Sequence, residues 1–401
     1  MFSKPMRIIL GLLLTALCQL TFAQTQDPLT LIASYTLQTD SNIFRLPAAA
    51  NTQALLGRAD GSEQIAVSAL GFAVKTKQSL QQFEFSATAI DYQYQNFSYL
   101  SFTAANFDAA WRWSFTPRWH GSLTATRKET LNSFADYTGY NNRNVRLDTG
   151  TALDSEYEID GPWRLVAGLS GNREANQAAQ VAGSDFSNTA ANAGVRYAFA
   201  SGSNITFRTI TYQGSYLNVV IPSAGLLDNA YAQQDQDLRL HWDLGGGSAA
   251  DANLTYSART HPNYVQRDWD GFNTGLNLNW LVTGKSSLVA GYQHQLGDYA
   301  TASSNYSQTD TLTLSPVWQI RPKASLQLQS TYAQVQYMGS PTTVPTLARR
   351  DINRSLNLSL NWQPYDKLSF STSVGTLSRG SSQTGFDYDA SQLSFSAQLF
   401  Y

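Results

Sequence analysis

The 401-residue sequence has a single cysteine and little charge. That cysteine, Cys18, lies within the first twenty residues, so the rest of the chain has no thiol for a disulfide, a zinc site or a nucleophile. Charged residues make up 14% of the chain, against roughly 25% in ordinary soluble domains. The net charge of −2 provides no basic surface, and we expect no nucleic-acid partner.

Long apolar runs are absent after the N-terminus, and so are enzyme motifs. No later segment is long and apolar enough to predict a transmembrane helix. The four histidines form no H-E-x-x-H motif, and neither a G-x-S-x-G elbow nor a glycine-rich phosphate loop stands between a strand and a helix. We therefore predict no cofactor, no metal site and no catalytic residue, and we do not expect an enzyme.

The N-terminus has the pattern of a signal peptide. Lys4 and Arg7 give a positive start, Ile8 to Leu17 form a short apolar stretch, and Thr21 and Ala23 place small residues before a cleavage site. The prediction is a signal peptide over residues 1–23 and one mature domain over residues 24–401.

One pattern recurs eight times along the mature chain. An aromatic residue is followed two positions later by an apolar residue, and then by a turn. Hairpins with an aromatic ring beside each turn are typical of the girdle of a membrane barrel, although a β-propeller also repeats at about 40 residues. The aromatic residues of the eight copies are Phe72, Trp113, Tyr157, Tyr197, Trp242, Trp280, Trp318 and Trp362.

The C-terminus favours the barrel over a soluble periplasmic propeller. From Gln392 to Tyr401, apolar and polar residues alternate to the last position. A strand ending on an aromatic residue resembles the terminal strand that the outer-membrane barrel-assembly machinery recognises. With the signal peptide, this predicts an all-β protein of the Gram-negative outer membrane, surrounded by membrane lipid and lipopolysaccharide.

The spacing of turns predicts the strand count. Eight short turns join sixteen strands, and Leu29–Gln38 and Asp387–Tyr401 add a first and a last strand. The prediction is an up-and-down antiparallel barrel of about 18 strands with both termini periplasmic. If residues 29–38 lay inside the pore instead, 16 strands would remain. The predicted turns are Lys75–Leu80, Thr116–Trp119, Asp160–Trp163, Ser201–Asn204, Gly245–Asp251, Thr283–Ser286, Arg321–Ala324 and Pro364–Lys367.

Alternation then assigns side chains to the two faces of the wall. An Arg or Lys facing lipid near the midplane would cost roughly 2–4 kcal/mol, so polar residues that alternate with leucine are assigned to the lumen. The girdle residues predicted at the periplasmic interface are Trp113, Trp242, Trp280, Trp318 and Trp362. The predicted lumen-lining residues are Glu84, Asp108, Arg112, Arg146, Asp148, Asp154, Glu156, Arg196, Arg208, Asp237, Arg239, His241, Asp243, Arg259, Asn277, Asn279, Asn357 and Asn361.

The predicted lumen is polar and mixed in sign, which suits hydroxyl-rich solutes. Amides and hydroxyls exchange hydrogen bonds with sugars much as they do with water, and weak contacts let a solute enter and leave. These residues do not separate a sugar conduit from a general diffusion porin for small hydrophilic solutes. An outer-membrane barrel enzyme stays as a second alternative, because inward carboxylates beside Ser or His occur in barrel hydrolases.

A set of short motifs resembles the EpsL family, outer-membrane proteins of exopolysaccharide operons associated with the exosortase B system. The resemblance implies a barrel that passes an exopolysaccharide chain to the cell surface, alongside a periplasmic polysaccharide exporter. It implies no role for individual residues. The mixed sign of the lumen disfavours an anionic polymer. The motifs are Asp40–Leu46, Trp111–Arg118, Leu131–Tyr137, Gln266–Asp268, Leu314–Trp318 and Gly385–Asp389.

Overall fold

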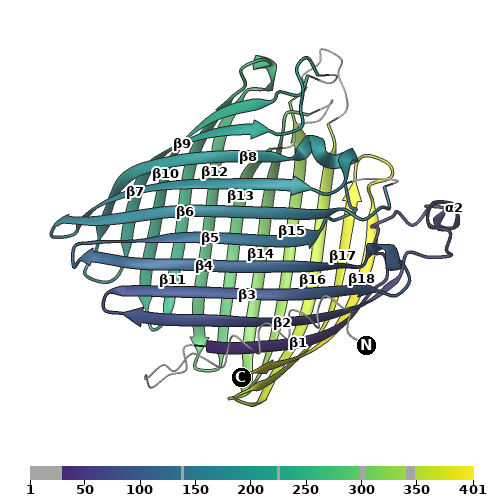
Figure 1. Ribbon diagram of the computed structural model, residues 1–401, viewed down its shortest axis with the longest axis horizontal. Coiled ribbons are helices and arrows are strands. Elements are labelled where there is room, and N and C mark those ends of the chain that lie inside the picture. Colours follow the sequence, from purple (N-terminus) through teal and green to yellow (C-terminus); the bar gives the residue numbers. More distant parts are fainter. Residues whose placement is uncertain (1–28, 137–139, 224–225, 299–303, 340–347) are drawn as a thin grey trace, which may run out of the picture.

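The computed structural model describes residues 29–136, 140–223, 226–298, 304–339 and 348–401. These residues form one antiparallel sheet of 18 strands that closes on itself as a barrel (Figure 1). The predicted all-β barrel of about 18 strands is confirmed, and the alternative of 16 strands is wrong. The predicted signal peptide lies outside the described residues.

Each strand pairs with the strands before and after it in sequence, in an up-and-down meander. The strands are 12 to 16 residues long, more than the ~9–11 residues that a tilted strand needs to cross a bilayer. They are β1 (Leu29–Asp40), β2 (Glu63–Gln78), β3 (Gln81–Tyr94), β4 (Phe102–Thr116), β5 (Trp119–Leu131), β6 (Val145–Asp160), β7 (Trp163–Asn176), β8 (Phe186–Ala198), β9 (Asn204–Tyr216), β10 (Ala230–Gly245), β11 (Ser248–Thr260), β12 (Trp269–Thr283), β13 (Ser286–Asp298), β14 (Tyr306–Arg321), β15 (Ala324–Met338), β16 (Arg350–Tyr365), β17 (Leu368–Ser381) and β18 (Tyr388–Phe400).

The first strand closes the barrel. β1 pairs with β2 on one side and with β18 on the other, where Ile32 lies opposite Phe400 and Asp40 opposite Gln392. The backbone N–H of Leu31 also donates to the carbonyl oxygen of Tyr401 at 2.7 Å. Closure removes both sheet edges, so the backbone groups of the wall find partners within the sheet, as lipid requires.

Outward and inward residues alternate along each strand. On β16, Leu356, Leu358 and Leu360 expose 48%, 40% and 39% of their surface on the outside, while Asn357 and Ser359 lie on the opposite face. A soluble protein rarely exposes so many leucines to water, whereas a membrane barrel exposes them to lipid. The closed barrel with this apolar belt is an outer-membrane β-barrel.

The turns at one end are short, and the loops at the other end are longer. The predicted turn at Gly245–Asp251 is shorter in the structure, because β10 runs to Gly245 and β11 begins at Ser248. Gly245, Gly246 and Gly247 all have positive φ angles (77°, 62° and 80°), which glycine adopts without a side-chain clash. Short turns mark the periplasmic end of such barrels and long loops the extracellular mouth.

In the described parts of the mouth loops there are four short helices. They are α2 (Thr52–Leu56), which projects beyond the barrel in Figure 1, and the short 3-10 helices η2 (Ser98–Leu100), η3 (Ala179–Ser184) and η4 (Val265–Arg267). Among the described residues, no helix has the length and apolar character needed to span a membrane.

Candidate functional site

The lumen has a charged wall on one side. We call the inward charged residues of β2 to β11, apart from Glu63 at the mouth, the charged arc. Acids and bases lie on neighbouring strands, mostly within reach of one another. The members of the charged arc are Lys75, Lys77, Glu84, Asp108, Arg112, His120, Lys128, Arg146, Asp148, Asp154, Glu156, Glu158, Arg164, Glu174, Arg196, Arg208, Asp235, Asp237, Arg239, His241, Asp243, Asp251 and Arg259.

Asp237 on β10 is almost fully buried, with 2% of its surface exposed. Its carboxylate lies 2.7 Å from Arg208 Nη2 on β9 and 2.9 Å from Arg239 Nε, and it accepts a 2.8 Å hydrogen bond from Thr255 Oγ1 on β11. A buried carboxylate needs such compensation, because desolvation of an unpaired charge costs several kcal/mol.

Glu156 on β6 is a second centre of ion pairing. Arg196 on β8 pairs with its carboxylate, His120 Nε2 lies 3.7 Å away and Arg164 Nε 3.9 Å away. Arg164 also pairs with Glu158 at 3.2 Å. These side chains bridge β5 to β8, so the charges hold one another in place across the wall.

Smaller groups continue the same pairing. Glu84 lies 3.1 Å from Lys75 Nζ and 3.3 Å from Arg112 Nη2. Arg146 contacts Asp148 at 3.1 Å and Glu174 at 3.7 Å. His241 Nδ1 lies 2.7 Å from Asp251 Oδ1. The charged arc is therefore largely compensated within itself.

The rest of the lumen wall is polar but uncharged. We call the inward Asn, Gln, Ser and Thr residues of β12 to β18 and β1 the neutral arc. Among the described residues of these strands, inward charges occur only at the two ends of the barrel. The neutral arc includes Asn273, Asn277, Asn279, Gln293, Thr311, Thr313, Ser315, Gln327, Gln329, Thr331, Ser355, Asn357, Ser359, Asn361, Ser371, Ser373, Gln392, Ser394, Ser396, Gln398, Ser34, Thr36 and Gln38.

Cavities with polar side chains lie along the inner wall, and two of them adjoin. The larger, of about 770 Å³, lies where the two arcs meet and is lined by Arg239 and His241 on one side and by Asn277 and Gln293 on the other. The second, of about 600 Å³, is lined by Arg112, Glu156 and their neighbours. Arg196 and Arg208 line both cavities, so the two are adjacent spaces along the charged arc.

Apolar loop residues pack together at the extracellular mouth. The rings of Phe97 and Phe134 each lie 4.8 Å from the ring of Phe44, measured between centroids, and all three are buried. They come from the β3–β4, β5–β6 and β1–β2 loops, and Tyr94 and Ile65 on the wall pack with them. The three loops are therefore joined by a small hydrophobic core.

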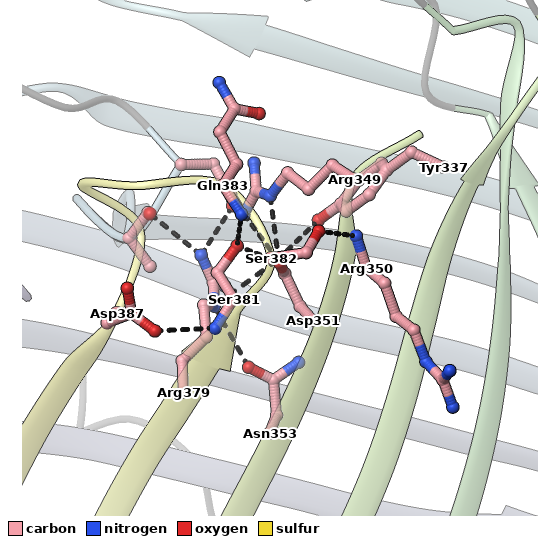
Figure 2. Close-up of polar contacts among 12 residues, drawn as sticks. Tyr337, Arg349, Arg350, Asp351, Asn353, Arg379, Ser381, Ser382, Gln383 and Asp387 are labelled. Atoms are coloured by element: carbon pink, nitrogen blue, oxygen red, sulfur yellow. Dashed lines mark hydrogen bonds and ion pairs between the residues drawn. The ribbon is translucent and has the colours of Figure 1, made fainter. Parts of the chain in front are cut away.

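A buried carboxylate holds the arginines that contact the β5–β6 loop at a distant part of the mouth. Asp351 on β16 is fully buried and accepts hydrogen bonds from Arg349 Nε at 3.0 Å, Ser381 Oγ at 2.6 Å and Tyr337 Oη at 3.1 Å (Figure 2). The adjoining Arg379 of β17 lies in the same group, with Nε 3.8 Å from Asp351.

Asp136 of the β5–β6 loop completes this group. Its Oδ1 lies 3.2 Å from Arg349 Nη2 and 2.8 Å from Arg379 Nη1. Arg379 Nη1 also donates to the carbonyl oxygen of Ala135 at 2.9 Å. Five strands, β18 and β1 to β4, separate the two attachment points along the wall, so the loop extends across the mouth.

A second group of loops joins the other side of the mouth. Asp228 of the β9–β10 loop accepts hydrogen bonds from the backbone N–H groups of Asn263 and Tyr264, at 2.7 and 3.0 Å. Burial raises the pKa of Asp228, but hydrogen bonds from the side chain and backbone of Asn263 outweigh it, so the pKa lies below the ordinary aspartate value. Arg267, 1% exposed, donates to the carbonyl oxygen of Ser304 at 2.7 Å.

The strand register places every predicted lumen residue on the inward face. It brings together Glu84 with Arg112, Arg146 with Asp148, Glu156 with Arg196, and Asp237 with Arg208 and Arg239. The partners lie far apart in the sequence or on alternate positions. The remaining predicted residues do not gather into a single centre. Asp243 Oδ1 accepts a hydrogen bond from the N–H of Gly245 in the periplasmic turn, and Asp108 lines a separate space beside Asp148.

The five girdle tryptophans differ in their surroundings. Trp242, Trp280, Trp318 and Trp362 expose 44%, 48%, 53% and 51% of their surface, whereas Trp113 exposes 6%. Trp113 packs against Phe115 and Trp119, and its ring lies over Gly121, where a Cβ would come within 2.5 Å.

Several functional candidates were absent from the sequence-based set. Arg164, Glu158 and Asp251 follow the same alternation as their predicted neighbours, so strict application of that alternation would have included them. Asp136, Asp351 and the arginines between them had no such signal, because a loop contact across the barrel follows no period. Among the described residues, no group of His, Cys, Asp and Glu has the arrangement of a metal site.

Comparison with known proteins places the fold. No protein-family model and no curated protein matches the chain. OccK1 (OpdK) of Pseudomonas aeruginosa is similar in structure, with a TM-score of 0.53, 13% identity, and coverage of 93% of this chain and 99% of that one. OccK2 (OpdF) of the same organism has a TM-score of 0.52 and 14% identity, over 93% of this chain and 97% of that one.

Two such structures contain small molecules. OpdK has been solved with vanillate, and OccK2 in complex with glucuronate (TM-scores 0.53 and 0.50, identities 13% and 14%, covering 93% of this chain and 99% and 97% of those chains). At these identities the likeness concerns the fold alone. The chain is thus an outer-membrane β-barrel whose structural neighbours include the porins OccK1 (OpdK) and OccK2 (OpdF).

Proposed function

We propose that the protein is a passive diffusion channel of the outer membrane for small hydrophilic solutes. The observation that supports this most strongly is the pair of adjoining polar cavities, about 770 and 600 Å³, that follow the lumen past Arg196 and Arg208. A barrel of this size leaves an aqueous interior unless a plug fills it. The small polar molecules bound by OpdK and OccK2 agree with this class of solute.

Planar-bilayer recording tests the proposal. The purified barrel, added to one side of a lipid bilayer in potassium chloride, should produce stepwise increases in current, each step proportional to voltage over a moderate range. Heat-denatured protein in the same detergent is the control and should produce none. The proposal fails if folded barrel, verified by its faster migration in unheated SDS gels, inserts without any conductance.

Exopolysaccharide export is a second candidate, and it rests on the resemblance to the EpsL family. The neutral arc supports it, because hydroxyl and amide groups line one wall over most of its length. The β5–β6 loop weighs against it, since a polymer would have to pass the tether between Asp136 and Arg379. For this reason we place small-solute diffusion first, and the polysaccharide chain, a periplasmic exporter, lipopolysaccharide and the assembly machinery remain proposed partners.

A deletion strain separates the two candidates. If the barrel exports polysaccharide, its deletion should abolish surface polymer, and expression of the intact gene should restore it. If the barrel is a diffusion channel, the deletion strain should retain its polymer and take up small solutes more slowly. On neither candidate does a side chain act in catalysis, so we also propose that the protein is not an enzyme.

A further inference from the structure

The two walls of the lumen differ in how much of their hydrogen-bonding capacity is already used. The acids Glu84, Glu156 and Asp237 of the charged arc are each held by two or more side chains. In the neutral arc, bonds between side chains are scattered. Examples are Asn357 Nδ2 to Ser359 Oγ at 2.9 Å and Thr36 Oγ1 to Ser396 Oγ at 2.8 Å.

Three amides of the neutral arc illustrate the unused capacity. Asn277 on β12, Gln329 on β15 and Asn361 on β16 are exposed, and on the inward side of a barrel this exposure is to the water of the lumen. Within the described part of the chain, their side chains make no hydrogen bond to protein. A primary amide has two donors and an acceptor with two lone pairs, so each can exchange water for a solute hydroxyl group.

Glycines shape the same wall. A Cβ at Gly375 would lie 3.0 Å from Asn357 Oδ1, and one at Gly275 would lie 2.3 Å from Asn253 Oδ1. The missing side chains therefore leave room for the neighbouring amides to lie along the wall. This arrangement places donors and acceptors beside the water path without narrowing it.

The chemistry of this wall selects a class of solute. A sugar or polyol offers alternating donors and acceptors, and it replaces wall-bound water at little net cost. An ion is stabilised less by this wall, because the amide and hydroxyl dipoles are not arranged around it. The charged arc offers it little more, because most of its charges are already paired with one another. Many weak contacts favour entry and still permit exit.

We propose that the neutral arc is a track along which uncharged, hydroxyl-rich solutes such as sugars and polyols bind transiently as they cross the barrel. This inference rests on the proposed channel function and specifies its substrate class. The charged arc is then the self-paired wall that gives the lumen its shape.

Near-isosteric substitutions test the track. The variant Asn277→Leu/Gln329→Met/Asn361→Leu removes three amides with little change in volume. Proteoliposomes containing it should swell in maltotriose, an uncharged trisaccharide, on the order of 3-fold more slowly than wild type, while potassium chloride conductance stays close to wild type. The control is Lys75→Gln/Glu84→Gln, which removes both partners of a charged-arc pair and should leave maltotriose entry unchanged.

The outcomes separate the two claims. Absence of any conductance in the wild type would refute the channel itself. Normal conductance with equal maltotriose entry in the triple variant would overturn the track and leave the channel standing. Equal slowing in the Lys75/Glu84 control would also overturn it, because the effect would then not belong to the neutral arc. If the triple variant does not fold, the three single substitutions, each checked by gel mobility, should each slow maltotriose entry.

Discussion

Asp136 and Arg379 are 243 residues apart in the sequence, yet Arg379 Nη1 donates a hydrogen bond of 2.8 Å to Asp136 Oδ1 across the mouth of the barrel. The bond joins the β5–β6 loop to β17, from which β5 is separated by five strands, and Arg349 approaches the same oxygen. The β5–β6 loop is thereby held over the lumen at its extracellular end.

Loosening this tether should widen the channel. Asp136→Asn removes the negative charge that Arg349 and Arg379 share, so we expect a larger mean single-channel conductance and more frequent current fluctuations. The matched control is Asp366→Asn, which breaks the exposed periplasmic pair with Lys323 at 3.2 Å and should change neither quantity. Conductance of the Asp136 variant equal to wild type would show that the loop does not limit the current.

The buried carboxylate beneath the tether should matter for stability. Asp351→Ala removes the buried one of the two carboxylates, Asp351 and Asp136, that Arg349 and Arg379 share. Because Asp136 still pairs with both arginines, we expect the loss to be about 3 kcal/mol, the lower end of the cost of breaking a buried ion pair. Denaturant unfolding followed by gel mobility measures this loss. Asp60→Ala in the exposed β1–β2 loop is the comparison and should have little effect. A midpoint for Asp351→Ala that matches wild type would argue against the ion-pair account.

The two faces of β16 should respond differently to charge. Leu358→Arg points a cation at lipid within the apolar belt and should lower the amount of folded barrel, by roughly 2–4 kcal/mol if it lies near the midplane. Ser359→Arg points into the lumen and should leave the amount of barrel close to wild type. Quantification of heat-modifiable protein in isolated outer membranes measures both. A greater loss for Ser359→Arg would refute the strand register.

Four of the girdle tryptophans should lie at the same depth in the membrane. In single-tryptophan variants reconstituted with brominated lipids, Trp242, Trp280, Trp318 and Trp362 should be quenched most by bromines near the same interface. Trp113 should be quenched less, because Phe115 and Trp119 cover its ring. Quenching of the four at different depths, or strong quenching of Trp113, would contradict this arrangement.

The strand architecture follows from local patterns, which can be recognised in the sequence. Alternation in stretches such as Leu356 to Trp362 depends only on the pleat of a strand between lipid and water, and short turns follow from Gly, Pro and Asp at fixed intervals. The strand count therefore matched the structure, including β1, whose partners in β18 lie at the other end of the chain.

What alternation does not describe is how loops pack on one another. Phe44, Phe97 and Phe134 come from three irregular loops, and their contact depends on the closed barrel bringing those loops together. The burial of Trp113 likewise depends on the rings beside it rather than on its place in the repeat. The sequence shows which strands carry inward charges and which do not. That these strands form two continuous arcs of the lumen follows only from the order of strands around the closed barrel.

Liposome swelling with solutes of graded size tests the central claim most directly. A passive channel through this lumen predicts rapid swelling in arabinose, slower swelling in sucrose and little in the tetrasaccharide stachyose, with no requirement for energy. Liposomes that contain the folded barrel and swell no faster than protein-free liposomes in any of the three sugars would contradict the account.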